Sequence, residues 1–261
     1  MEMPDDRKIN ETRLYGANWN AIHGGYFSDL AVAAPLVKVI AEAITHANPH
    51  VVADLGGGTG FILQQVAAAL GSADKSFIAV DQSAEQLNSV DDRFSTLKLS
   101  VGDITRGDLG AAGSSLMFIM RSVLHYFRRD RQREILRHLR RQMNAGESFI
   151  HQSACFANAA YKDMWNYLYE LMNVDKWFES EAELASALSD EGWRILSITS
   201  APPLHINSAE LAERFQLEKD QMRQITENLN NRYSALTGFF VPEDDGFATS
   251  LHYKIFKCAA V

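Results

Sequence analysis

The residues with the clearest chemical potential form a glycine-rich segment, ADLGGGTGF, at 53–61. The apolar run VVADL at 51–55 precedes the glycines and predicts a strand, and a helical pattern runs from Thr59 to Leu70. Glycines let the backbone turn sharply and approach a ligand, and the free N–H groups at a helix start attract polar or anionic groups. The segment therefore predicts a turn that binds a nucleotide-like cofactor.

The spacing within this turn favours one kind of ligand. The dinucleotide fingerprint is G-x-G-x-x-G, whereas Gly56, Gly58 and Gly60 follow G-x-G-x-G, and Phe61 stands where the third fingerprint glycine would be. No GK[ST] ending follows, which excludes a P-loop. Asp54 lies two residues before the first glycine, where a carboxylate would gain nothing from a phosphate but would attract an ammonium or sulfonium group.

The pattern D-x-G-x-G-x-G after a strand resembles the first motif of class I S-adenosylmethionine-dependent methyltransferases, particularly those acting on small molecules. The resemblance covers roughly residues 45–155. It implies a Rossmann-like α/β fold with a seven-stranded sheet, whose last strand is antiparallel and inserted beside the fifth, and helices on both faces. It also implies S-adenosylmethionine as cofactor, in-line methyl transfer to a small-molecule acceptor, and no metal. A non-methylating homologue that binds S-adenosylmethionine, a cyclase or a binding protein, is the alternative.

By this resemblance, several segments hold the cofactor. Asp81 closes the second strand and would accept hydrogen bonds from both ribose hydroxyls, with Gln82 next to the adenine. Asp103 would take the adenine amino group, with its two neighbours flanking the ring, and Arg121 would contact the methionine end. The complete expected set is Asp54, Gly56, Gly57, Gly58, Gly60, Asp81, Gln82, Gly102, Asp103, Ile104 and Arg121.

Candidates for handling the acceptor are weaker. The segment RSVLHYF at 121–127 resembles the family's post-strand segment, in which His125 is a tentative general base; a histidine there could equally orient the loop by hydrogen bonding. Aromatic residues of the N-terminal stretch and of a helix at 157–173 could roof an acceptor pocket, although the helix could equally serve core packing. The expected substrate contacts are Tyr15, Trp19, Tyr26, Tyr126 and Trp165.

The apolar pattern predicts the elements that position these residues. Strands alternate with helices up to residue 155, which predicts a mostly parallel sheet with right-handed crossovers. The expected strands lie at 51–55, 76–81, 96–101, 115–120 and 147–155. Helices are expected at 29–47, with Ser28 as its cap, and at 130–143. Later elements are helices at 157–173 and 181–191, a strand at 193–200 ended by Pro202 and Pro203, a long helix at about 208–231 and a final strand at 249–259.

Length and charge set broader limits. The 261 residues fit one domain, with a helical N-terminal lid (1–47), a cofactor-binding core (48–155) and the remaining sheet with helical insertions (156–261).

A net charge of −8 opposes nucleic acid binding, and an arginine-rich stretch at 128–141 fits a solvated helix face better than an anion or RNA patch. We expect no membrane span, and a monomer or homodimer. Cys155 and Cys258 form no CxxC pair, which favours a reducing cytoplasm.

Overall fold

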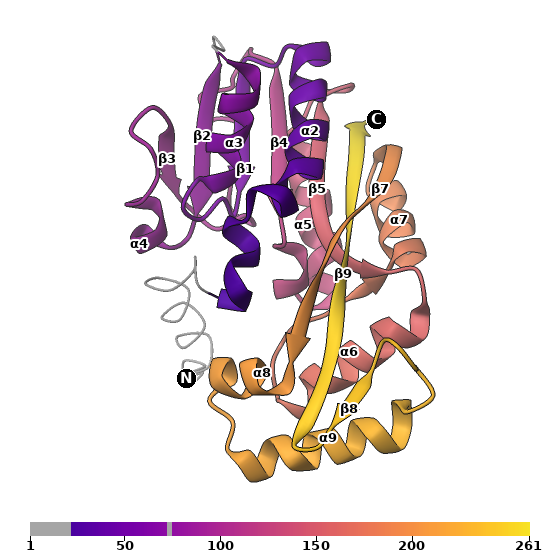
Figure 1. The fold of residues 1–261 in the computed structure, drawn as a ribbon. Coiled ribbons are helices and arrows are strands. Elements are labelled where there is room, and N and C mark those ends of the chain that lie inside the picture. The colour runs from indigo at the N-terminus through magenta and orange to yellow at the C-terminus, as the bar shows by residue number, and fades with distance from the viewer. Residues whose placement is uncertain (1–21, 72–74) are drawn as a thin grey trace, which may run out of the picture.

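A computed structural model of the chain describes residues 22–71 and 75–261, and one mixed sheet runs through it (Figure 1). Its strands are β1 (Val51–Leu55), β2 (Ser76–Asp81), β3 (Ser95–Lys98), β4 (Leu116–Arg121), β5 (Ser148–Phe156), β6 (Glu179–Ser180), β7 (Trp193–Asn207), β8 (Val241–Glu243) and β9 (Gly246–Ala260). The main path is β3-β2-β1-β4-β5-β9-β7, and β6 and β8 pair with β5 and β9 beside it. The antiparallel β9 lies between β5 and β7, which confirms the expected insertion beside the fifth strand.

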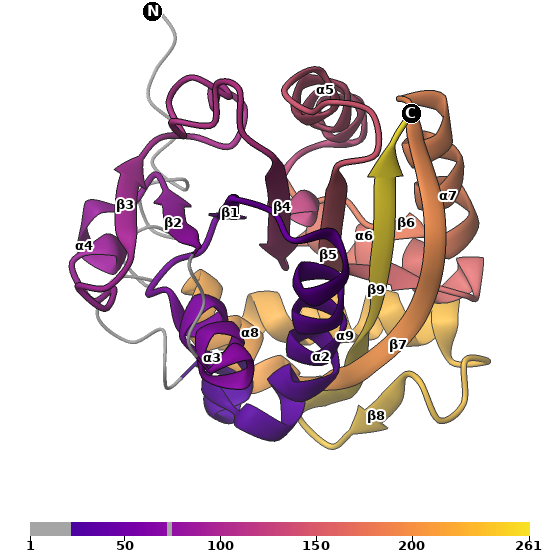
Figure 2. The same cartoon turned by 90° about the horizontal axis from the view of Figure 1, so that it is seen from above.

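Helices cover both faces of this sheet (Figure 2). On one face lie α2 (Leu30–Ala47) and α3 (Phe61–Leu70), and on the other α5 (Arg129–Arg141) and α7 (Glu181–Asp190). Because side chains alternate along a strand, Val52 packs in the first of two apolar clusters and Ala53 in the second. The short α4 (Ala84–Leu87) starts at Ser83, whose side chain caps the Gln86 amide as the sequence pattern indicated.

The helix α2 packs on one face of the sheet. It is capped by Asp29, whose carboxylate accepts from the Ala31 and Val32 amides, and not by Ser28 as expected. By length and composition α2 could cross a membrane. One side of it is nevertheless core, packed beside α3 and the sheet through Ala33, Leu36, Val37, Ile40, Ala43 and Ile44.

Two long strands carry the elements that lie beyond the carboxyl ends of the parallel strands. β7 and β9 each have 15 residues and run past β1 and β4 toward the lower end of the molecule in Figure 1. There they meet α6 (Ala159–Leu171), α8 (Ser208–Phe215) and α9 (Lys219–Tyr233). The chain therefore places a helical layer below the edge where a parallel sheet usually binds its ligand.

Two sequence-based expectations about this lower part are wrong. Pro202 and Pro203 do not end β7, because β7 pairs only with β9 at the edge of the sheet, where a missing amide is tolerated, and a register shift between Ala201 and Leu204 accommodates them. The long helix expected at 208–231 is two helices. The chain breaks at Gln216, whose φ of 52° is left-handed, and α9 starts afresh with a capping box between Glu218 and Gln221.

A nearly buried ion pair fixes the starts of β4 and β5. Arg106 donates to both carboxylate oxygens of Glu147, at 2.7 and 2.8 Å, and the two side chains are 17% and 10% exposed. Glu147 also accepts from the Leu116 amide at 2.8 Å. Removing one partner of such a pair leaves the other charge without compensation, which is costly where water is scarce.

We therefore expect Arg106→Met to lower the free energy of unfolding by about 3 kcal/mol, as measured by urea denaturation followed by circular dichroism. The matched control is Arg133→Met, which removes an ion pair with Asp190 whose side chains are 40% and 54% exposed. That exposed pair contributes less than about 1 kcal/mol. Equal losses in the two variants would contradict this assignment.

Candidate functional site

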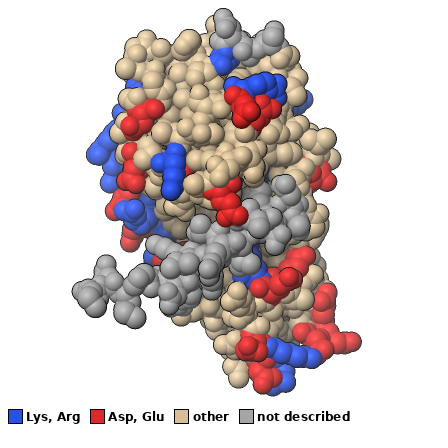
Figure 3. Space-filling model, turned by 90° about the vertical axis from the view of Figure 1, so that its left-hand side faces the viewer, with Lys and Arg blue, Asp and Glu red and all other residues tan. Residues whose placement is uncertain are grey.

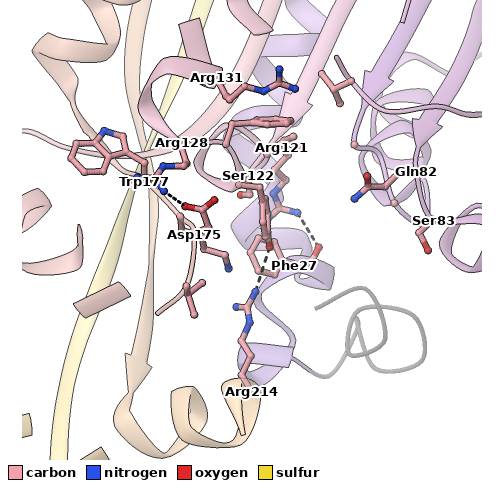
Figure 4. Close-up of a pocket in the computed structure, with 18 of the residues that line it drawn as sticks. Phe27, Gln82, Ser83, Arg121, Ser122, Arg128, Arg131, Asp175, Trp177 and Arg214 are labelled. Carbon is pink, nitrogen blue, oxygen red and sulfur yellow. Dashed lines mark hydrogen bonds and ion pairs between the residues drawn. The ribbon is translucent and has the colours of Figure 1, made fainter. Parts of the chain in front are cut away.

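A cleft of about 1370 Å³ opens at the carboxyl ends of the parallel strands. One wall comes from the glycine turn and the ends of β1, β2 and β4. The facing wall comes from the 3₁₀ turn η2 (Leu124–Tyr126), α6, the loop at 172–177, α8 and α9. Figure 4 shows Gln82 and Ser83 on the first side and Arg128, Asp175 and Trp177 on the other.

The glycine turn is tightly packed, and its backbone explains its composition. Gly56, Gly58 and Gly60 have φ values of 70°, 55° and 73°, a region that residues with a side chain rarely adopt. A Cβ on Gly58 would lie 2.5 Å from Oε1 of Gln86, and one on Gly56 would lie 2.5 Å from Val123. The turn therefore presents bare backbone to the cleft, and Gly56, Gly57 and Gly58 all line it.

Asp54 brings an uncompensated carboxylate to the cleft. It is 2% exposed, and its Oδ2 has no hydrogen-bond partner among residues 22–71 and 75–261. Burial and the nearby Asp81 raise the pKa of Asp54 to about 7, although Arg121 opposes the shift. A cation beside Oδ2 would satisfy this oxygen and stabilise the ionised form.

Asp81 ends β2 and is held by backbone amides. Its Oδ2 accepts from the Gly58 amide at 3.0 Å and its Oδ1 accepts from the Ser83 amide at 2.8 Å, so the carboxylate joins the glycine turn to the next loop. Burial raises the pKa of Asp81, and these amides counteract the rise. Gln82 follows it, exposed and lining the cleft.

Arg121 is the last residue of β4 and lines the cleft with a buried guanidinium. Its Nη1 donates to the Phe27 carbonyl at 2.9 Å, and the group lies 5.8 and 5.4 Å from the ring centroids of Tyr26 and Phe27 (Figure 4). Nε and Nη2 are buried without a partner in the described part of the chain. The site therefore offers an unsatisfied acceptor on Asp54 and unsatisfied donors on Arg121.

The expected adenine segment is placed differently from the sequence prediction. Leu99, Ser100 and Val101 line the cleft, whereas 102–104 do not. Ile104 is wrong as a flanking residue, because its side chain is fully buried in the cluster beside α5 and its carbonyl bonds to His138. Gly102 packs against Ile135 of α5, and Asp103 is exposed outside the cleft lining.

His125 lies behind the cleft wall. It is 7% exposed, stacks on Phe178 at 5.3 Å between ring centroids and is absent from the lining. Burial, together with the charge of Lys176, holds the pKa of His125 well below its usual value. Its carbonyl accepts from the Trp177 amide at 3.1 Å. These contacts place the imidazole away from the cleft, where it cannot act as a general base. The bond to the loop comes from the backbone of His125, and its imidazole Nδ1 is buried without a hydrogen-bond partner in the described part of the chain.

Of the expected substrate contacts that the structure describes, one lines the cleft and two do not. Tyr126 is the residue that lines the cleft. Tyr26 is instead buried, donating from its hydroxyl to the Pro202 carbonyl at 2.6 Å, and Trp165 is a core residue that bonds to the Ser250 carbonyl. Tyr15 and Trp19 lie outside the described residues.

Sequence reasoning missed most of the second wall. From α6, one helical face lines the cleft at spacings of three and four residues: Asp163, Asn166, Tyr167 and Glu170. This spacing was available in the sequence and indicates a single face. The contributions of Lys176, Arg214 and Arg232 carried no such signal, because they come from a loop and two helix ends that only the fold brings together.

Comparisons with known proteins agree with this geometry. Residues 52–146 match the family model described as a methyltransferase domain. No curated protein matches the sequence. Within residues 22–71 and 75–261, no group of three or more histidine, cysteine or acidic side chains is arranged to hold a metal ion.

Solved structures share the fold at low sequence identity. A protein from Bacillus halodurans C-125 described as a candidate methyltransferase has a TM-score of 0.68 and 13% identity, over 87% of this chain and 98% of that one. Magnesium protoporphyrin IX methyltransferase from Synechocystis PCC 6803, with bound SAM, has a TM-score of 0.56 and 11% identity over the full length of both chains. For 1,6-didemethyltoxoflavin-N1-methyltransferase from Burkholderia thailandensis, with its substrate and S-adenosylhomocysteine bound, the values are 0.56 and 13%, over 100% of this chain and 92% of that one.

The environment of Asp54 predicts an unusual titration. In the free protein, the carboxyl carbon of Asp54 is expected to titrate near pH 7, in NMR spectra assigned with Asp54→Asn. S-adenosylhomocysteine carries an ammonium group, and its binding should lower this midpoint by about one unit or more. The ligand should therefore bind more tightly as Asp54 ionises, between about pH 6 and pH 8. A midpoint near 4 in the free protein would contradict the burial argument.

Proposed function

We propose that this chain is an S-adenosylmethionine-dependent methyltransferase of the class I fold, and that the cleft binds cofactor and acceptor side by side. The methyltransferase-domain match over residues 52–146 and the shared fold of the solved structures support the proposal. The observation that carries the proposal is that one continuous cleft contains both the glycine turn with Asp54 and Asp81 and the aromatic wall of Tyr126, Tyr167 and Phe215. A methyl donor on the first wall would face an acceptor on the second.

The unsatisfied atoms of the first wall fit the cofactor. Oδ2 of Asp54 suits the ammonium at its amino-acid end, and Nε and Nη2 of Arg121 suit the carboxylate. The carboxylate of Asp81, which two backbone amides already orient, suits the ribose hydroxyls of the cofactor. Gln82 and the 99–101 segment take the adenine end, and the bare backbone of Gly56–Gly58 allows close approach.

The protein contributes chiefly position and exclusion of water. The bound cofactor supplies a methyl group on a positively charged sulfur, already a strong electrophile. Tyr126 lines the acceptor wall, and its hydroxyl accepts from Nη2 of Arg214 at 3.4 Å. Neither His125 nor the other buried histidine of the sheet, His151 of β5, lines the cleft. The rate of methyl transfer therefore depends on how the protein orients an acceptor that is already nucleophilic.

We further propose that the acceptor is a small molecule and not a nucleic acid. Arginines of α5 are engaged by acids next to it: Arg133 binds Asp190 at 3.0 Å and Arg137 binds Glu191 at 2.7 Å. On the face shown in Figure 3, outside the grey atoms, basic and acidic side chains are interspersed. A monomer or homodimer in the cytoplasm, with Cys155 and Cys258 as buried free thiols, completes the proposal.

The role given to Arg121 can be isolated by comparing two ligands. We expect Arg121→Met to weaken S-adenosylhomocysteine binding by about tenfold to a hundredfold, because a charge-assisted hydrogen bond is lost. 5′-Methylthioadenosine lacks the amino-acid end, so its affinity should be unchanged. Isothermal titration calorimetry measures both. Equal losses for the two ligands would mean that the substitution had distorted the whole cleft.

Methyl transfer itself is tested by an acceptor screen. The protein is incubated with S-adenosylmethionine and fractionated small metabolites, and S-adenosylhomocysteine formation is followed by mass spectrometry. We expect at least one fraction to support turnover, and Asp54→Asn to reduce it by about tenfold or more through weaker cofactor binding. Cofactor binding with no turnover in any fraction would favour a non-methylating homologue.

A further inference from the structure

Ser122 follows the last residue of β4 and carries a buried hydroxyl that the fold does not use. The side chain is 5% exposed, and its Oγ has no hydrogen-bond partner in the described part of the chain. The residue lines the cleft next to Arg121. In the view of Figure 4, both lie between Gln82 on one wall and Asp175 on the other. A buried hydroxyl without a partner costs free energy, which a ligand that accepts from it would offset.

The backbone of Ser122 adopts a conformation that serine rarely takes. Its φ is 60°, in the left-handed region that glycine favours. The Ser122 amide donates to the Gln152 carbonyl at 2.8 Å, which holds this turn in place. A residue with a Cβ is strained in the left-handed region. Such strain at a residue that lines a cleft points to a function of the side chain that glycine could not supply.

The left-handed turn also brings Ser122 to the same cleft as Arg121. Side chains alternate along a strand, so two successive extended residues would point to opposite faces. Ser122 lies just beyond β4, where its φ ends the extended conformation, and both residues line one cleft. Arg121 has the unpartnered donors Nε and Nη2, and Ser122 has one hydroxyl. Two consecutive residues therefore bring three donor atoms to one region.

Neighbouring contacts place this region on the cofactor wall. Val123 packs so closely against the glycine turn that a Cβ on Gly56 would lie 2.5 Å from its side chain. Arg121 is close enough to Asp54 for its charge to oppose the rise in the pKa of that carboxyl. Ser122 lies between Arg121 and Val123 in the chain. Its hydroxyl is therefore beside the part of the cleft that suits the amino-acid end of the cofactor.

Tyr253 can orient the Ser122 hydroxyl without using its proton. Burial raises the pKa of Tyr253, and Ser122 is the first of the groups that oppose the rise, so the two side chains are close. A serine hydroxyl can accept from one group while it donates to another. A hydrogen bond donated by the Tyr253 phenol would thus leave the Ser122 proton for a ligand. A ligand group that only accepts, such as a carboxylate, matches this proton.

We propose that Ser122 is a carboxylate-binding residue, whose hydroxyl donates to the amino-acid carboxylate of the cofactor together with Nε and Nη2 of Arg121. An ionised carboxylate only accepts and has about four lone-pair sites. It can therefore bind the guanidinium fork and a hydroxyl at the same time. This inference rests on the proposed function, since it adds a residue to that cofactor site. It also explains why a serine, and not a glycine, stands at a left-handed position.

Two substitutions at Ser122 test the proposal by isothermal titration calorimetry. Ser122→Ala removes the hydroxyl, and Ser122→Gly removes the hydroxyl and also relieves the backbone. We expect each to weaken S-adenosylhomocysteine binding by about tenfold, because one charge-assisted hydrogen bond is lost. The decarboxylated analogue of S-adenosylhomocysteine keeps the ammonium group and lacks the carboxylate. Its affinity should be the same for both variants as for the unaltered protein.

Thermal melting of the ligand-free protein gives a second readout. Both substitutions remove a buried hydroxyl without a partner, so neither should lower the melting temperature. Ser122→Gly also relieves the strained turn and should raise the melting temperature by about 2 °C or more. A variant that is as stable or more stable, but binds the ligand more weakly, shows that the side chain serves binding and not folding.

Thr249→Val on β9 is the matched control. Thr249 is 4% exposed, and its Oγ1 is likewise buried without a partner in residues 22–71 and 75–261. Thr249 does not line the cleft. Valine has nearly the same shape as threonine, so the substitution removes a hydroxyl of the same kind at a distant place. We expect unchanged affinity for S-adenosylhomocysteine and no loss of melting temperature.

The outcomes distinguish this inference from the proposed function. If the unaltered protein bound no S-adenosylhomocysteine, the proposed function would fail, and the inference with it. If that ligand bound but both Ser122 variants kept the full affinity, only the role of Ser122 would be overturned. The same holds if the variants lost affinity for the decarboxylated analogue equally. A lower melting temperature together with weaker binding of both ligands would assign Ser122 to the fold alone.

Discussion

The site depends on two opposite charges, the carboxylate of Asp54 and the guanidinium of Arg121, which neighbouring strands hold in the interior without a hydrogen bond between them. Asp54 pairs in register with Ile119, and Arg121 lies two residues further along β4 on the same face. Neither side chain is satisfied: an oxygen of Asp54 and two nitrogens of Arg121 are buried without partners in the described part of the chain. Such groups cost folding free energy unless a ligand completes them. A zwitterionic ligand such as the proposed cofactor would satisfy both groups.

The rest of the fold keeps these charges dry and reachable from one side. The glycine turn closes over Asp54 so tightly that a Cβ on Gly57 would lie 2.9 Å from the carboxyl carbon of Asp54. Phe27 and Tyr26 cover Arg121 from the side of the N-terminal 3₁₀ segment η1 (Ile22–Ser28). The long strands β7 and β9 then bring α8 and α9 below the cleft, where these helices complete the wall that η2, α6 and the loop at 172–177 begin.

The first strands, the glycine turn and the position of Asp81 at the end of the second strand were predictable because each depends on a contiguous segment. The strand order was expected from the resemblance to a family and is confirmed, whereas the residues that hold a cofactor stay a prediction. The errors concern residues whose role is set across the fold. Ile104 and Trp165 were assigned to the site because of the segments in which they lie, but the side chains of both point into the core. His125 follows the right strand, yet Tyr126 is the neighbour that reaches the cleft. Pro202 does not end its strand, because β7 lies at the edge of the sheet, and the sequence does not show which strand will lie at an edge.

The arginine-rich stretch shows how one sequence feature divides into two physical roles. Along α5, Arg133 and Arg137 lie on the side of α7 and pair there with Asp190 and Glu191. At the start of the stretch, Arg128 and Arg131 line the cleft, and they pair with Asp175 and Glu134 respectively. Each of these four arginines therefore has an acidic partner, and the stretch leaves little unpaired positive charge in a protein whose net charge is −8.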